Sequence, residues 1–375
     1  MFGSNAVLFV AFSAMCLALL TGWLVVEDRI DNPLRVFAVG RLEHTVEVWN
    51  ASNPRQCLWQ PRPRPPTSVS FFYPSSRCGV WLHLQHWVPT EPLPERPEEE
   101  GERGPFWRGI ALLLHAGQQN SGQYAQLIPL LHQLYILPVT MDFAGHGYSW
   151  GDRHHVVEFE DHVKDALSVL TLLRKPHVHI HGPEVLHKPP IFLVGDSMGG
   201  LVAKLLAQSQ RPHTFAGVVL SSPLLRLPGH PETWAVKVLE LGAKLFPKLH
   251  VGSAKPPPEH YEPHPAGVIQ DPDCPNCPVT ANFGYQVVRA VDSSAENDSE
   301  VSFPLLVIHS VGDREADIEG SRALVSKARS ESKRLIEVPG NQHHLLPELH
   351  PAATQSFFEF IEEQIVAYAE LEKLL

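Results

Sequence analysis

The chain has 375 residues, of which 43% are hydrophobic and 19% are charged. This length suits one large α/β domain or two ordinary domains, with enough apolar residues for a buried core. The formal net charge of -11 argues against nucleic acid as the main partner, because a phosphate backbone selects basic protein surfaces. Five cysteines are too few and too scattered for a disulfide framework, and the pair Cys274 and Cys277 lacks the second pair of a zinc ribbon.

An uncharged apolar segment runs from Ala6 to Val26. A helix of about 20 residues crosses the hydrocarbon core of a bilayer, so the segment predicts a single membrane anchor. A cleaved signal peptide and a buried soluble helix are the alternatives, but no basic n-region precedes the segment and no A-x-A site ends it. Arg29, Arg35 and Arg41 follow the segment, which favours a cytoplasmic location for the rest of the chain and leaves the opposite side open.

Strand and helix patterns alternate along most of the remaining chain. Short apolar or alternating runs predict strands at 80–87, 109–115, 136–141, 191–194, 217–220, 305–309 and 334–338. Amphipathic spacing predicts helices at 122–134, 158–173, 201–208 and 353–375. This alternation predicts an α/β fold with a mostly parallel sheet and helices on both faces.

The segment 223–303 interrupts the alternation. It contains an apolar helical pattern at 234–249, a proline-rich tract at 255–278 and a second short helix near 285–291. An insertion between two core strands predicts a cap, or lid, over the site. The expected parts are an anchor at 1–26, a linker or extension at 27–76, a first core segment at 77–222, the cap at 223–303 and a second core segment at 304–375.

The motif G-x-S-x-G lies between an expected strand and an expected helix, as Gly195-Asp196-Ser197-Met198-Gly199. In this context the serine lies on a sharp strand-to-helix turn, and small residues on either side let the two elements approach each other. The helix N-terminus directs its dipole and free N–H groups at a developing oxyanion. Ser197 is therefore the predicted nucleophile.

A serine nucleophile needs a base that an acid orients, in the chain order serine, acid, histidine for this arrangement. Asp313 follows the expected strand 305–309 and is the predicted acid, with Asp317 as the reserve candidate. His343 precedes the last helix and is the predicted base, with its neighbour His344 as the alternative.

The oxyanion of such a reaction needs two backbone donors. The residue after the nucleophile supplies one, which is Met198 here, and the loop after an earlier strand supplies the other. In the loop His115-Ala116-Gly117, the amide of Gly117 is the predicted second donor. No metal or organic cofactor is implied.

Four segments resemble the monoacylglycerol lipase group of α/β-hydrolases, of the serine aminopeptidase S33 type, which also includes lysophospholipase-like and caffeoylshikimate esterases. They are His115 to Tyr124, Asp142 to Arg153, Gly195 to Gly200, and the acid and base segments Val311 to Asp317 with Gly340 to His343. The resemblance implies an α/β-hydrolase fold with an apolar cap that receives an acyl chain.

Three residues depart from the motifs of that group. Ala116 replaces a glycine, Gln119 replaces a glutamate and Asn120 replaces a histidine, which affects the backbone of the oxyanion loop and its anchoring. His146, between two glycines, is expected to be a structural turn residue.

The resemblance implies a carboxylic ester hydrolase that cleaves a lipid such as a monoacylglycerol or a lysophospholipid through an acyl-enzyme on Ser197. The expected partners are this lipid ester and a membrane, with the oligomeric state left open. The alternatives are an esterase for small-alcohol or phenolic-acyl esters, an acyltransferase, and a catalytically inactive, membrane-tethered binding protein on a hydrolase scaffold.

Overall fold

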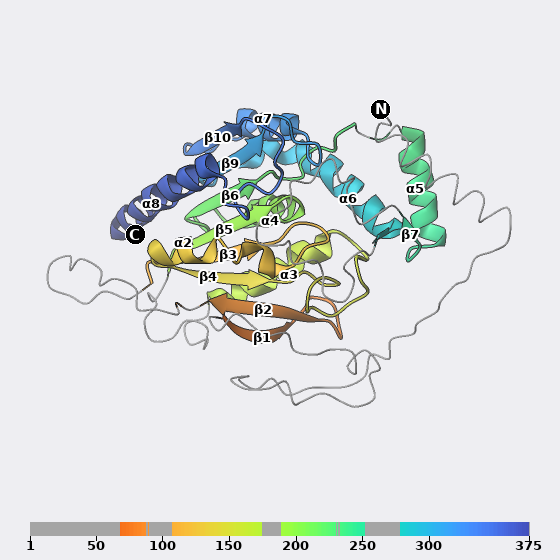
Figure 1. Cartoon of the computed structure of the whole chain (residues 1–375), viewed down its shortest axis with the longest axis horizontal. Coiled ribbons are helices and arrows are strands. Elements are labelled where there is room, and N and C mark those ends of the chain that lie inside the picture. Colours follow the sequence, from red (N-terminus) through yellow and green to blue (C-terminus); the bar gives the residue numbers. More distant parts are fainter. Residues whose placement is uncertain are drawn as a thin grey trace.

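One eight-stranded β-sheet organises the part of the chain that the structure describes (Figure 1). The structure is a computed structural model, and it describes residues 68–87, 89, 107–174, 189–229, 231, 233–251 and 278–374. In their order across the sheet the strands are β1 (Ser68–Pro74), β2 (Trp81–Trp87), β4 (Ile136–Met141), β3 (Gly109–Leu114), β5 (Ile191–Asp196), β6 (Gly217–Ser221), β9 (Leu305–Ser310) and β10 (Lys333–Val338).

The sheet is mostly parallel, as the sequence predicted. The strands from β4 to β10 pair in parallel, and only β1 with β2 and β2 with β4 pair antiparallel among the described strands of this sheet. Every residue of β3, β4, β5, β6 and β9 is buried. Their continuous apolar runs reflect this, because a strand covered on both faces needs no polar alternation.

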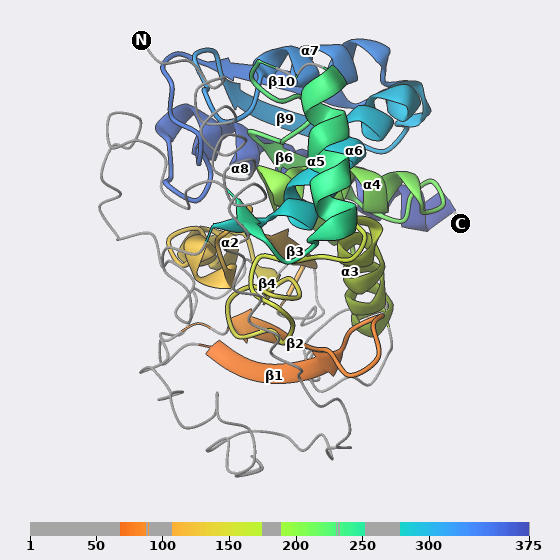
Figure 2. The same cartoon turned by 90° about the vertical axis from the view of Figure 1, so that its right-hand side faces the viewer.

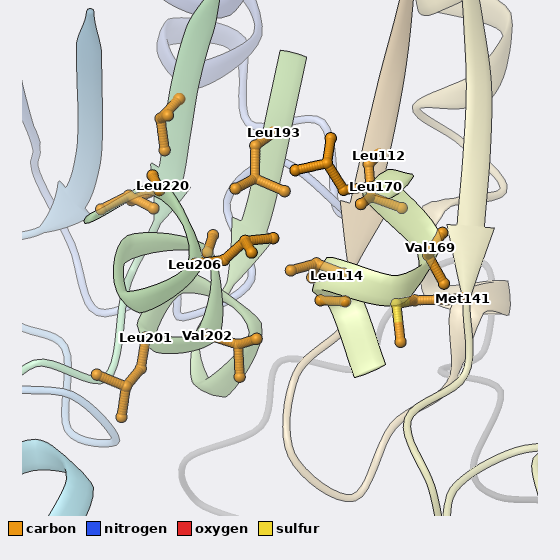
Figure 3. Close-up of a cluster of buried hydrophobic side chains, with 14 of the residues drawn as sticks. Leu112, Leu114, Met141, Val169, Leu170, Leu193, Leu201, Val202, Leu206 and Leu220 are labelled. Atoms are coloured by element: carbon orange, nitrogen blue, oxygen red, sulfur yellow. The ribbon is translucent and has the colours of Figure 1, made fainter. Parts of the chain in front are cut away.

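Helices cover both faces of the sheet, each over its own cluster of buried side chains. On one face Leu112 and Leu114 of β3 join residues of α3 (Glu160–Leu173), α4 (Met198–Gln208) and α7 (Ile318–Lys327). Figure 3 shows part of this cluster, with Leu201, Val202 and Leu206 on α4 and with Leu112, Leu193 and Leu220 on the strands. On the other face the intervening β3 residues join α2 (Ile128–Gln133) and α8 (Pro351–Leu374).

One predicted helix is divided in the structure, and two elements of the described core were not expected. The predicted helix 122–134 is divided into η2 (Ser121–Tyr124) and α2, and α2 has Pro129 in its first turn. Proline has no N–H to donate and is tolerated at the start of a helix, so it marks a new helix rather than the interior of a longer one. Strand β1 and helix α7 were not predicted.

The segment predicted to be a cap contains α5 (Thr233–Leu245), the short antiparallel strands β7 (His250–Val251) and β8 (Val279–Thr280), α6 (Ala281–Ser294) and η4 (Ala295–Glu300). Helix α5 crosses α6 on its outer side (Figure 2). It ends earlier than the predicted 249, because Pro247 disfavours helical backbone at the residue before it. Helix α6 buries one face against the core, and α5 buries only Gly242 and Ala243.

A buried ion pair fixes the end of this segment to the core. Lys204 of α4 lies 2.7 Å from a carboxylate oxygen of Asp298 in η4 and donates a hydrogen bond to the carbonyl oxygen of Ser294. The side chains of Lys204 and Asp298 are 1% and 5% exposed. Since a buried charge needs a partner, the pair specifies how η4 lies on α4.

The prediction of a single-pass membrane protein is corrected by this structure. No helix within the described ranges is both long enough and apolar enough to cross a membrane. The longest of them, α8, carries Glu359, Glu362 and Glu363 along its length, and charges are costly in a hydrocarbon core. The segment Ala6 to Val26, the linker up to residue 67, and the pair Cys274 and Cys277 lie outside the described residues.

Replacing Phe360 of α8 tests the packing of that helix on the sheet. Its ring is fully buried against Gly217 of β6, so Phe360→Ala should lower the free energy of unfolding by about 3–5 kcal/mol. Val366 on the same helix is 56% exposed, and Val366→Ala should change the free energy of unfolding by no more than about 0.5 kcal/mol. Denaturant unfolding of both variants measures the difference, and equal losses would contradict this packing.

Candidate active site

Ser197 lies at the turn between β5 and α4 in a strained backbone conformation. Its φ is 51° and its ψ is -115°, in a region that side chains other than glycine rarely adopt. Its N–H donates to the carbonyl oxygen of Ser221 at 3.0 Å, and its own carbonyl oxygen accepts from Leu224 N at 3.0 Å. Hydrogen bonds on both sides hold the turn, as is typical of strain stored at a functional site.

The glycines of the motif are required by close approach of the backbone. A Cβ atom at Gly195 would overlap the carbonyl group of Gly199. One at Gly199 would overlap the carbonyl oxygens of Leu114 and His115, at the end of β3. The turn that carries Ser197 is therefore pressed against the oxyanion loop, and no room exists there for a side chain.

His343 and Asp313 are hydrogen bonded to each other. His343 Nδ1 donates to Asp313 Oδ2 at 2.7 Å, and the two side chains are 6% and 0% exposed. His309 Nε2 lies 3.3 Å from the same carboxylate oxygen, and Glu315 N donates to Oδ1 at 2.8 Å. Burial by itself would raise the pKa of Asp313, but the hydrogen bonds from His309 and His343 outweigh it and hold the pKa well below its usual range.

The two reserve residues make other contacts. Asp317 caps α7 by accepting from Glu319 N at 3.0 Å, and its carboxylate lies 3.1 Å from Arg226. His344 Nδ1 donates to Asp196 Oδ2 at 2.6 Å. The acid and base expected first, Asp313 and His343, are thus the ones that the fold brings together.

Ser197 and His343 lie at the same end of the sheet. In the described structure their side chains are not hydrogen bonded to each other. Asp196 precedes Ser197 and His344 follows His343, and the contact between Asp196 and His344 brings the two loops together. A hydrogen bond from nucleophile to base is often long before substrate binds and tightens in the reacting complex.

The two predicted oxyanion donors are neighbours. A Cβ atom added to Gly117 would lie 3.7 Å from both Cβ and Sδ of Met198. Neither backbone amide donates to another described residue. Two free N–H groups beside the turn of Ser197 are what an oxyanion requires.

His115 holds the oxyanion loop in place from within the core. Its Nδ1 donates to the carbonyl oxygen of Ala116 at 2.7 Å, and its Nε2 accepts from Phe143 N at 3.0 Å. Burial lowers the pKa of His115, which keeps the ring neutral and leaves Nε2 free to accept. Ala116 is not among the described residues with positive φ, so an alanine fits here without strain.

Asp142, directly after β4, connects its own loop to η2 and to β2, and no role was assigned to it from the sequence. It is fully buried, accepts from Ser121 N at 2.7 Å and from Tyr148 N at 2.9 Å, and lies 2.8 Å from His83 Nδ1. Asn120 caps η2 by accepting from Gly122 N at 2.9 Å. Of the two polar residues at the altered positions, Asn120 therefore has a local structural partner, whereas the buried Oε1 of Gln119 has no hydrogen-bond partner among the described residues.

Sequence reasoning did not identify the contacts of His309 and Asp196 with the predicted acid and base loops. His309 ends the apolar part of β9 and Asp196 stands inside the serine motif, so position at a strand end was the only available signal.

His146 is buried in its turn, and its Nδ1 lies 3.2 Å from the carbonyl oxygen of Ala144. Within the described ranges no group of three or more His, Cys, Asp or Glu residues is arranged to hold a metal ion.

Comparison with known proteins gives one family and several similar proteins. Residues 107–350 match the model of a family described as serine aminopeptidase, S33. Human monoglyceride lipase is 28% identical over 285 residues, which are 76% of this chain and 86% of that protein. Among solved structures, Paleococcus ferrophilus monoacylglycerol lipase has a TM-score of 0.57 at 24% identity, covering 71% of this chain and 96% of that one. A soluble variant of monoglyceride lipase from Saccharomyces cerevisiae has a TM-score of 0.60 at 17% identity, covering 82% and 97%.

Asp313→Asn should distinguish the predicted acid from its reserve. An asparagine cannot stabilise the imidazolium and favours the wrong tautomer of His343, so kcat should fall by roughly 10³- to 10⁴-fold. Asp317→Asn keeps the helix cap and should change kcat by less than about threefold. Steady-state hydrolysis of a chromogenic ester by the two variants measures this, and the reverse ranking would make Asp317 the acid.

Gly199→Ala tests the close approach at the turn. The added methyl group has no room beside the carbonyl oxygens of Leu114 and His115, so the variant should lose most ester hydrolysis and react slowly with a fluorophosphonate. Gly284→Ala in α6 is a matched control, because its added Cβ would lie 4.0 Å from Leu239. The control should keep its activity, and an active Gly199→Ala enzyme would contradict the geometry.

Proposed function

This chain belongs to the serine aminopeptidase S33 family and is a carboxylic ester hydrolase, and we propose that it cleaves a lipid ester through an acyl-enzyme on Ser197. The family model covers more than half of the 375 residues. The observation that carries the mechanism is the buried pair of His343 and Asp313 at the end of the sheet where the strained turn holds Ser197.

In the first half of the reaction, Ser197 Oγ attacks the carbonyl carbon of the ester while His343 Nε2 takes the hydroxyl proton. Asp313 accepts the Nδ1–H hydrogen bond, which fixes the tautomer and stabilises the imidazolium that forms. The carbonyl oxygen becomes an oxyanion that the amides of Gly117 and Met198 stabilise. A donor of this kind contributes on the order of 3–4 kcal/mol to the transition state.

In the second half, the tetrahedral intermediate expels the alcohol, which receives the proton from His343. The acyl group stays on Ser197 as an ester. Water then attacks this ester with His343 as base, and the carboxylic acid leaves as Ser197 regains its proton. Asp313 stays ionised throughout, in agreement with the depressed pKa of its carboxyl group.

The proposed substrate is a monoacylglycerol or a lysophospholipid. Its support is the likeness to human monoglyceride lipase over 86% of that protein's length. The segment from α5 to η4, inserted between β6 and β9, supplies apolar surface for an acyl chain. Exposed side chains there include Leu241 and Leu245, at 57% and 60%.

Replacement of the nucleophile tests the mechanism and the substrate together. Ser197→Ala should lower monoacylglycerol hydrolysis by at least roughly 10³-fold and abolish covalent labelling by a fluorophosphonate. Ser209→Ala, at the other end of α4, is the matched control and should react as the unaltered protein does. Fatty acid release and labelling by mass spectrometry are the measurements.

Three other outcomes separate the alternatives. Hydrolysis of short soluble esters with monoacylglycerols and lysolipids left intact would contradict the proposed lipid substrate and favour an esterase for small esters. New esters formed in the presence of competing alcohols would indicate acyl transfer. Absence of any Ser197-dependent adduct would indicate a catalytically inactive binding protein.

A further inference from the structure

A second pair of histidine and carboxylate lies beside the first. Asp196 is the last residue of β5 and directly precedes Ser197, while His344 directly follows His343 in the loop after β10. His344 Nδ1 donates to Asp196 Oδ2 at 2.6 Å. The side chain of Asp196 is fully buried and that of His344 is 12% exposed. A buried carboxylate of this kind requires a partner that neutralises it.

His344 is charged at neutral pH. Burial alone would lower the pKa of His344, but the charge and the hydrogen bond of Asp196 outweigh burial and raise the pKa to about 9. The ring is therefore an imidazolium where most histidines are neutral. The other ionisable groups that act on the pair come from three loops and one helix: Glu315, Glu348, His343, His115 and Tyr124.

His344 packs directly on the predicted base. The ring centroids of His343 and His344 are 4.8 Å apart, edge to face at 62°. The loop that carries both rings is hydrogen bonded to the last residue of β9 and to the loop after it. Ser310 Oγ donates to the carbonyl oxygen of Gln342 at 2.5 Å, and Gly312 N donates to that of Gly340 at 2.7 Å. Those bonds hold this loop against the end of β9 and the loop of the acid, and Leu346 N reaches Ser221 Oγ at 3.4 Å. The contact of His344 with Asp196 joins the loop of the base to the residue directly before Ser197.

We propose that the ion pair of Asp196 and His344 is a positioning device that sets the His343 ring against Ser197. It links the residue before the nucleophile to the residue after the base, so a change in the pair moves one catalytic side chain relative to the other. The inference rests on the proposed function, because it assumes that Ser197 and His343 react together.

The ion pair of Asp196 and His344 makes kcat depend on pH in the alkaline range. The folded protein holds the proton of His344 more tightly than the unfolded chain does. The contribution of the pair is therefore complete below the ordinary histidine pKa of roughly 6.5 and is lost as the pH rises through about 9. The value of kcat for the unaltered protein should fall across that range while KM stays nearly constant.

The test uses two near-isosteric variants and their combination. In His344→Gln the amide can still donate to Asp196 but carries no charge, and in Asp196→Asn the carboxylate charge is removed. Each should lower kcat roughly 10- to 100-fold with little change in KM, because small misplacement of a reacting group has effects of this size. Each should also lose the decline of kcat near pH 9.

The double variant and a control complete the design. If the two residues act as one unit, Asp196→Asn with His344→Gln should be no slower than the slower single variant. His250→Gln, at an exposed histidine of β7, should keep the original kcat and pH profile. Labelling rates with a fluorophosphonate, measured on protein that is folded by circular dichroism, separate misplacement of the site from loss of the fold.

Two results would overturn the inference while leaving ester hydrolysis through Ser197 intact. An unchanged kcat and pH profile in His344→Gln would show that the pair does not position His343. A loss as complete as that of His343→Gln would make His344 the base itself. If Ser197→Ala kept full hydrolysis, the proposed function would fail, and the positioning role with it.

Discussion

The close approach of three backbone segments at Ser197 is the constraint on which the site depends. The turn after β5 reaches the end of β3 only because Gly195 and Gly199 have no side chains. That approach holds Ser197 at a φ of 51° and sets the amide of Met198 beside Gly117. The proposed nucleophile and the proposed oxyanion donors thus depend on one tight contact, and a single methyl group in it would disturb both.

Around this contact the fold gathers buried charge at one edge of the sheet. Parallel strands end together, so side chains that follow them meet although they are distant in sequence. Three buried aspartates each have an imidazole within hydrogen-bond distance there, because a carboxylate without water needs a strong donor. The pairs are Asp142 with His83, Asp196 with His344, and Asp313 with His343. These pairs lie beside the proposed oxyanion loop, the proposed nucleophile and the proposed base.

The histidines of this chain therefore divide by their environment. His115 is neutral because burial lowers its pKa, and it serves as both donor and acceptor inside the oxyanion loop. The pKa of His344, with a carboxylate as partner, is raised to about 9. The neutral ring of His115 thus holds a loop in place, whereas the ring of His344 carries a charge beside the proposed base.

The sequence by itself determined the alternation of strands and helices and the serine motif, and it predicted an acid and a base in that order, because these depend on local periodicity and on short motifs. It did not reveal β1, whose pattern is weak, or the division of 122–134 at Pro129. Only the tertiary structure decided between Asp313 and Asp317 as the hydrogen-bond partner of His343, and only the tertiary structure paired His344 with Asp196. Neighbouring residues have the same local pattern, and which way each side chain points is fixed by contacts with distant strands.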